Sequence, residues 1–338
     1  MFVLLNMIMA DAENCPIFAP ASSRSIIEWE NLPRNVWQHV LTFLPKQDIL
    51  SLSQVCRHLF AVASDNLIWR NFLQKEMDHW LCVHSDSNPF PLLQSGELTT
   101  KAVYLKGRNA SVWRPRSSIL PSWLLVRLSD SPCVAIFGPG LESANYSLMR
   151  CILTDSTQKK LHGLTMGPMA QKLQEGIPQG ISLAFQGRRF NLLALYSAIA
   201  SKRFDDRTPS DRVDNSLLFE QDVESQQVVV KQQIQTILDK CSAYIFAINN
   251  EADLDQDRVQ NITKELSLML SQRHTEIPLL ILSCGRMGHN WRSPATVTKI
   301  LQLDLLGSGK QKWAIYQCDL PGLHGLDRAL AWLFHQWD

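Results

Sequence analysis

The chain has 338 residues, enough for two domains, and 45% of them are hydrophobic, which allows buried cores. Its formal net charge of +1 gives no electrostatic basis for binding nucleic acid or a membrane surface, and we expect neither partner. The eight cysteines are scattered without a C-x-x-C motif, which argues against a disulfide framework or a metal site. They are typical of reduced thiols in a protein of the cytoplasm or nucleus.

Residues 1–27 are predicted to form a flexible N-terminal tail. Its first ten residues, MFVLLNMIMA, are apolar, but no basic region precedes them, and Asp11 and Glu13 follow. A secretory signal normally begins with basic residues, and a membrane-spanning helix needs about 20 apolar residues. We therefore interpret this stretch as a leader or an alternative start.

Residues 28–75 are predicted to form three short helices. Pro33 suits a first helical turn, Pro45 ends the first helix, and Ser64-Asp65-Asn66 offers caps for the third. Apolar residues recur at helical spacing, but on more faces than so small a core can bury. A surplus of apolar surface usually marks a binding site. The alternative is the start of a larger all-helical domain.

The segment WENLPRNVWQHVLTFLPKQDILSLSQVCRHLFAVASDNLIWR carries Leu-Pro, Phe-Leu-Pro, Asp-Ile-Leu, Val-Cys-Arg and Trp-Arg in order. It resembles an F-box, the helical module by which a substrate receptor docks onto a ubiquitin ligase. The resemblance implies a set of adaptor-facing residues: Leu32, Pro33, Val36, Leu44, Pro45, Ile49, Leu52, Val55 and Trp69.

Residues 76–130 are predicted to form a linker region. The stretch GELTTKAVYLKGR has the pattern of a helix, which we expect to pack onto the F-box. Four basic residues surround Trp113, and we interpret them as a solvated surface rather than a phosphate contact; they are Lys106, Arg108, Arg114 and Arg116.

Residues 131–338 alternate between predicted strands and helices. Buried strands are indicated by PCVAIFG, AYIFAINN, IPLLILSCG and WAIYQCDL, and helices by LESANYSLMRCIL and TVTKILQLDLL, among others. ISLAFQGRRFNLLALYSAIA reads as a hairpin that turns at Gly187-Arg188. This alternation predicts βαβ units and a mostly parallel sheet. The fold class expected for the whole chain is therefore α+β, with N-terminal helices followed by an α/β domain.

Two long segments interrupt this pattern. Residues 158–180 fit no element, and residues 201–224 are strongly charged, so we expect most of the second segment to be disordered.

The order of elements in residues 132–338 resembles a Ras- or Arf-like small GTPase domain, with CVAIFGPGLESANYSL at the phosphate loop. A phosphate loop needs G-x-x-x-x-G-K-S/T, because backbone N–H groups, a lysine and a hydroxyl hold the phosphates and magnesium. Counting from Gly138, the matching residues here are Ser143, Ala144 and Asn145. The required glycine, lysine and hydroxyl are therefore all missing.

Two further positions of the GTPase pattern are also replaced. No acid lies near Tyr196, where a magnesium-linked aspartate is expected, and Cys284, Gly285 and Met287 stand where N-K-x-D would read guanine. We therefore predict that this domain neither binds nor hydrolyses a nucleotide and holds no cofactor. Gly138 and Gly140 would then serve a tight strand-to-helix turn.

The pairing of an F-box with a degenerate GTPase-like domain resembles F-box substrate receptors of Skp–cullin–F-box ubiquitin ligases. The resemblance implies a non-catalytic protein, with an Skp adaptor and a cullin RING ligase core as partners. It also implies a protein substrate marked for degradation, such as a telomeric repeat-binding factor or a D-type cyclin. The alternatives are a divergent GTP-binding protein and a non-degradative F-box scaffold, and the sequence leaves a homodimer open.

Two surfaces are candidates for holding the substrate. An exposed strand edge at residues 181–186 would pair with a partner strand through Ile181, Leu183 and Phe185. A second patch combines Trp332, Phe334 and Trp337, and core packing of Trp332 remains an equal alternative. Thr208 and Ser293 each precede a proline, so they are candidate kinase sites.

Overall fold

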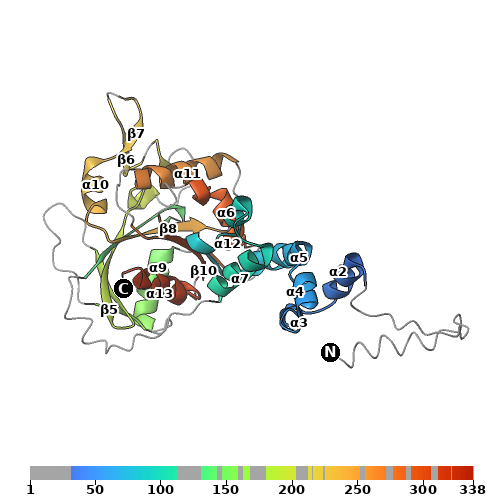
Figure 1. Cartoon of the computed structure of the whole chain (residues 1–338). Helices are drawn as coiled ribbons and strands as arrows, with labels where there is room; N and C mark the ends of the chain where they lie inside the picture. The colour runs from blue at the N-terminus through green and yellow to red at the C-terminus, as the bar shows by residue number, and fades with distance from the viewer. Residues whose placement is uncertain are drawn as a thin grey trace, which may run out of the picture. The chain divides into compact units, whose positions relative to one another are not determined.

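The structure is a computed structural model and separates into two compact units, the first ending at Ile68 and the second beginning at Trp69 (Figure 1). Each unit is described by itself. The described residues are 32–112, 131–142, 147–158, 163–167, 180–202, 212–214, 216–223, 225–251, 256–271, 277–286, 291–305, 311–320 and 322–337.

The first unit is helical. It contains α2 (Arg34–Thr42), α3 (Lys46–Leu52), α4 (Arg57–Ala63) and the start of α5 (Asn66–Glu76). Pro33 directly precedes α2, and Pro45 lies beyond the end of α2, as predicted; Pro45 is also the extended residue that precedes α3. Its buried hydrophobic residues are Trp37, Leu41, Ile49, Leu52, Leu59, Val62, Ala63 and Ile68.

The second of the three predicted helices, expected from the apolar stripe between Leu52 and Ala63, is divided into α3 and α4 in the structure. Cys56 adopts an extended conformation, with φ −155° and ψ 168°, and separates α3 from α4. Its Sγ accepts a hydrogen bond from the Leu59 N–H at 3.5 Å, so it caps α4. The apolar stripe continues across this break, which is why the sequence pattern indicated one helix.

Asp65 ties the ends of this helical unit together. Its Oδ1 accepts from the Leu67 N–H at 2.8 Å, at the start of α5. Its Oδ2 accepts from Arg34 Nε and from Gln38 Nε2 of α2, each at 2.7 Å. The predicted capping role of the Ser64-Asp65-Asn66 segment therefore falls to Asp65.

The second unit is built on an eight-stranded sheet in the order β1-β10-β9-β8-β2-β5-β4-β3. The strands, in chain order, are β1 (Cys82–His84), β2 (Cys133–Phe137), β3 (Leu164–Met166), β4 (Ile181–Phe185), β5 (Arg188–Ala194), β8 (Ala243–Asn249), β9 (Leu279–Gly285) and β10 (Trp313–Asp319). The four central pairings, from β10 to β5, are parallel, and the outer pairings are antiparallel. The expected fold class, helices followed by a mostly parallel α/β domain, is confirmed.

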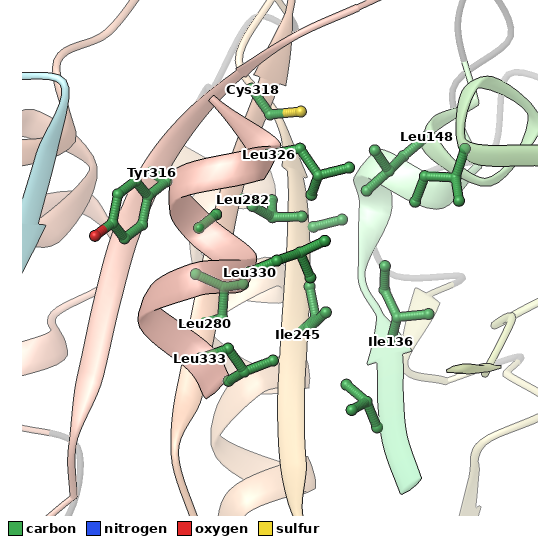
Figure 2. Packing of buried hydrophobic residues seen from close by; sticks show 14 of the residues in the cluster. Ile136, Leu148, Ile245, Leu280, Leu282, Tyr316, Cys318, Leu326, Leu330 and Leu333 are labelled. Atoms are coloured by element: carbon green, nitrogen blue, oxygen red, sulfur yellow. The ribbon is translucent and has the colours of Figure 1, made fainter. Parts of the chain in front are cut away.

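Helices cover both faces of this sheet. α9 (Leu148–Gln158) and α13 (Leu326–His335) lie on one face, and α11 (Gln256–Ser271) and α12 (Pro294–Ile300) lie on the other (Figure 1). Figure 2 shows aliphatic side chains of α13 meeting those of the central strands; they include Leu326, Leu330, Leu333, Ile136, Ile245, Leu280 and Leu282. These long apolar strands are buried on both faces, as parallel strands require.

The predicted linker contributes directly to the second unit. β1 pairs antiparallel with β10, so that Val83 lies opposite Ile315. Two helices follow, α6 (Pro89–Ser95) and α7 (Thr100–Ser111), and α7 confirms the helix predicted there. The Tyr104 ring of α7 packs on Trp69 and Phe72, with centroids 5.3 and 6.3 Å apart. Residues 76–112 therefore form part of this unit rather than a free connector.

The prediction of an exposed edge at residues 181–186 is wrong. β3 pairs with β4, with Leu164 opposite Phe185 and Met166 opposite Leu183. β3 lies in the segment that was expected to form no element, because three residues are too few to show a periodic pattern. The hairpin turn is also one residue earlier than predicted, at Gln186-Gly187, whose positive φ values of 50° and 82° suit a two-residue turn.

Two other boundaries differ from the prediction. The helix expected from Leu141 begins at Leu148, after a 3₁₀ turn at Pro139–Leu141, and α12 ends at Ile300. Part of the charged segment is ordered, because β6 (Phe219–Gln221) forms a hairpin with β7 (Val228–Val230), followed by α10 (Gln232–Leu238). Of the predicted basic patch, Lys106 is exposed and Arg108 is half-buried; Trp113, Arg114 and Arg116 lie outside the described residues.

Candidate functional site

The first candidate site is an exposed apolar surface on the helical unit. Val36 and Val40 of α2 and Phe43, which follows its last residue, recur at helical spacing on a face next to the one that buries Trp37 and Leu41. Phe43 is 74% exposed. Three more exposed apolar side chains of this unit are Val55, Phe60 and Leu67. Apolar surface gathered on one small helical unit is typical of a protein interaction site.

The residues predicted to face an adaptor divide into two groups in the structure. Pro33, Val36, Pro45 and Val55 are exposed, and Leu32 and Leu44 are half-buried. Three residues are buried: Ile49, Leu52 and Trp69. Ile49 and Trp69 have no exposed surface, because they face the interiors of their units, so here they support the surface rather than form it.

The sequence interpretation missed Val40, Phe43, Phe60 and Leu67 as surface residues. Val40 belongs to the apolar stripe of the first helix but was not counted among the adaptor-facing residues. The width of the apolar stripe could have identified Val40 as a surface residue. The stripe is wider than the face that one helix buries in so small a unit.

The second candidate site lies at the carboxyl ends of β2, β5, β8 and β9, where open α/β sheets bind their ligands. Gly138 follows β2 with φ +109°, and a Cβ there would meet the Ala247 carbonyl oxygen at 2.5 Å. A Cβ on Gly140 would meet backbone of Ala247 and Ile248 at 2.9 to 3.0 Å. The predicted use of both glycines in a tight turn is confirmed, because the loop packs directly on β8.

A buried cluster of charges fills one end of this edge. Arg212 bridges two carboxylates: Nη1 donates to Glu142 Oε2 at 2.7 Å, and Nε and Nη2 donate to Glu265 at 2.8 and 2.9 Å. Glu142 also accepts from the Ser197 N–H at 2.6 Å and from the Ser197 hydroxyl at 2.9 and 3.0 Å. Glu142 is 8% exposed and Glu265 is fully buried. We call this set, Glu142, Ser197, Arg212 and Glu265, the latch cluster.

Side chains of the protein also occupy the part of this site that lies at the ends of β8 and β9. Glu251, after β8, accepts from Arg286 Nε at 3.2 Å and from the Arg286 N–H. The Asn250 amide exchanges two hydrogen bonds of 3.1 Å with the Arg292 backbone. The Trp291 indole lies against Gly285, since a Cβ there would meet its Nε1 at 2.9 Å.

The positions that would bind a nucleotide in a GTPase lie at this same site, where the residues in this chain differ from the GTPase pattern. Cys284 and Gly285 are buried at the end of β9, and Tyr196 is half-buried after β5. Ser143, Ala144, Asn145 and Met287 lie outside the described residues. Within the part of the chain that the structure describes, no group of three or more His, Cys, Asp or Glu residues is arranged to hold a metal ion.

The predicted substrate-binding residues are mostly core residues. Leu183 and Phe185 are 1% and 0% exposed, because they face the sheet's hydrophobic core, and Ile181 is half-buried. With β4 paired on both sides, the proposed strand addition there has no structural basis.

The remaining surface candidates are also largely internal. Trp332 and Phe334 are 5% exposed, so core packing explains both, while Trp337 is half-buried and donates to the Ser242 carbonyl at 3.2 Å. Ser293 is a buried helix cap bonded to Asp78, so it is no accessible kinase site here. Thr208 lies outside the described residues.

Among the described helices, none is both long and apolar enough to cross a bilayer.

A family model described as F-box-like matches residues 29–75, which include the exposed apolar surface. F-box only protein 4 from Bos taurus is 24% identical over 94% of this chain and 87% of its own length. The chain is similar to F-box only protein 4. The Homo sapiens protein is 25% identical over 90% of this chain, and the Mus musculus protein is 24% identical over 90%.

This similarity extends well beyond the F-box-like segment. It covers about nine tenths of the chain, so the α/β unit takes part in it as well as the helical unit. The F-box resemblance seen in the sequence is therefore confirmed, and the matched proteins indicate F-box only protein 4 or a close paralogue.

Proposed function

We propose that this chain is a substrate-recognition subunit of an Skp–cullin–F-box ubiquitin ligase. The observation that carries the proposal is that the F-box-like match coincides with an exposed apolar surface. The name of the similar proteins, F-box only protein 4, supports the same role. The partners would be an Skp adaptor and a cullin core, at work in the cytoplasm or nucleus.

In this role the chain needs no catalytic side chain of its own. The transfer chemistry belongs to the ubiquitin-conjugating partner, and a receptor contributes by keeping substrate and ligase at high effective concentration. The helical unit would bind the adaptor, while the α/β unit would hold the protein substrate for ubiquitination and degradation.

We also propose that the α/β unit works without a nucleotide. Glu142 lies within the stretch that matches a phosphate loop, and its carboxylate is fixed there by Ser197 and Arg212. Arg212 also pairs with Glu265, so two carboxylates share one guanidinium and the cluster keeps an excess of negative charge. That excess opposes the approach of a phosphate, whereas nucleotide-binding loops offer N–H donors and a lysine. The buried position of Glu142 therefore supports an inert fold used for protein binding.

The test is recovery of partners from cells. Deleting residues 29–75 would remove Trp69 and Phe72, which pack on Tyr104, so point variants of the surface are the cleaner choice. Val36→Asp combined with Val55→Asp changes two exposed side chains. Mass spectrometry should find adaptor and cullin with the wild type but not with this variant.

Depletion of the chain should then raise the level of at least one protein that it co-purifies. A wild-type chain that recovers no adaptor would overturn the proposal. Recovery of the ligase core without any stabilised protein would instead favour a non-degradative scaffold.

A further inference from the structure

The described end of the charged segment is attached to the sheet edge by hydrogen bonds and ion pairs. We call the described residues from Arg212 to Val230 the strap; it carries the β6–β7 hairpin. Arg212 stands at its start, and the Leu217 N–H donates to the Ser197 carbonyl at 2.8 Å. Val213, Leu218 and Phe219 of the strap itself are buried. The strap therefore combines a polar attachment with an apolar underside.

The polar attachment joins three separate parts of the α/β unit. Glu142 follows the 3₁₀ turn after β2, Ser197 follows β5, and Glu265 lies in the middle of α11. One guanidinium of the strap contacts two of these residues through three of its nitrogens. A forked donor of this kind fixes position as well as charge, which an ammonium does not.

The charges of the latch cluster also show what depends on Arg212. Two carboxylates face one guanidinium, and both carboxylates are nearly or fully buried. Removing the guanidinium would leave two buried negative charges close together, and such a state is strongly unfavourable. Loss of the Arg212 guanidinium should therefore weaken the attachment of the strap.

We propose that Arg212 acts as an internal latch, which takes the ordering role that a bound nucleotide would have at this edge of the sheet. The position of the strap and its hairpin is then set by the chain itself. The hairpin is a fixed feature of the surface, and its conformation does not respond to guanine nucleotides.

The test is hydrogen exchange of the full-length protein, read by mass spectrometry. In Arg212→Met the amides of the strap should exchange about 100-fold faster or more, while those of β8, β9 and β10 should stay protected. Arg212→Lys keeps the positive charge but loses the forked donor, so its strap amides should exchange at a rate between those of the wild type and Arg212→Met. Arg189→Met is the matched control, because Arg189 is exposed on β5 and should change nothing.

Two outcomes of this experiment would overturn the proposal. Exchange of the strap in Arg212→Met could equal that of the wild type, or it could rise equally across the whole sheet, as for an ordinary core residue. Adding GTP and Mg²⁺ to the wild type provides an independent test, because any change in strap exchange would contradict a self-sufficient latch.

A triple variant separates a latch from simple neutralisation of charge. Arg212→Met with Glu142→Gln and Glu265→Gln removes all three charges. If the guanidinium fastens the strap, the strap should still exchange rapidly while the sheet keeps wild-type protection. A triple variant whose strap is as protected as in the wild type would refute the latch.

Discussion

Substituting His84 tests whether the linker strand β1 is an integral part of the α/β unit. Its Nε2 lies 2.9 Å from the Tyr316 hydroxyl on β10, and the residue is 9% exposed. Burial lowers the pKa of His84 to about 4, from an ordinary value of 6.5, and the charge of Asp86 offsets only part of this effect. The folded state therefore holds a neutral imidazole.

The direction of the pH effect follows from this lowered pKa. Below about pH 6.5 the His84 imidazole binds a proton in the unfolded chain but stays neutral in the folded chain. The free energy of unfolding therefore falls as the pH falls toward 4. Each pKa unit is worth about 1.4 kcal/mol, so the loss reaches about 3 kcal/mol below pH 4 and about 2 kcal/mol near pH 5. Above about pH 7.5 His84 contributes no pH dependence.

The assay is urea unfolding at about pH 7.5 and pH 5, for wild type and His84→Gln. The glutamine keeps a polar group near Tyr316 but does not titrate, so the variant should lose about 2 kcal/mol less than the wild type between the two pH values. His79→Gln, which changes an exposed imidazole, is the control and should follow the wild type. Equal losses in His84→Gln and wild type would refute the reasoning, because β1 would then not bury its imidazole against the sheet.

Two further predictions concern stability. Gly138→Ala should lower the free energy of unfolding by more than about 2 kcal/mol, since it adds both left-handed strain and a clash with the Ala247 carbonyl. Gly96→Ala, with φ +68° but no atom within 4 Å of the added Cβ, should cost only the strain of about 1–2 kcal/mol, and equal losses in thermal unfolding would count against the packed loop. Burial alone would raise the pKa of Asp65, but hydrogen bonds from Gln38, Leu67 and Arg34 lower it overall, so its contribution is present at neutral pH and lost as the pH falls through this lowered pKa. Asp65→Asn should therefore speed hydrogen exchange in α2 at neutral pH, with a cost of about 1–3 kcal/mol, and unchanged exchange would argue against Asp65 as the tie.

The sequence predicted the elements that carry strong local patterns. The α2 helix, the strands from β8 to β10 and the β4–β5 hairpin all show clear apolar periodicity or turn residues. Pro33 marked the start of α2 correctly, and Pro45 lies after the end of α2, as predicted. These features depend on residues that are close together along the chain, so their signal is visible without the fold.

The missed elements are those that depend on distant pairing. β1 and β3 have three residues each. β1 forms a strand because it pairs with β10, which lies more than 200 residues later in the chain. The latch cluster joins residues that are 53 and 70 positions apart, so no local pattern connects Arg212 with Glu265 or Glu142. The error at β4 has the same origin, because its partner β3 could not be recognised alone.

The candidate adaptor surface was predicted in part. Spacing identified the apolar residues of the helical unit but could not decide which of them the unit buries. Ile49 is fully buried and Val55 is 63% exposed, although both appeared equally suitable in the sequence. Packing between the helices determines which of these residues are buried, and the sequence pattern holds no information on that packing.

The central claim, that the helical unit binds an Skp adaptor, is tested most directly by calorimetric titration of the full-length chain with purified adaptor. The account predicts a complex with Kd of about 1 μM or tighter, weakened about 30-fold or more by Val36→Asp with Val55→Asp. Val223→Asp, at the 93% exposed tip of the β6–β7 hairpin, should bind as the wild type does. A folded wild-type chain that gives no heat of binding and forms no complex at micromolar concentrations would contradict the account.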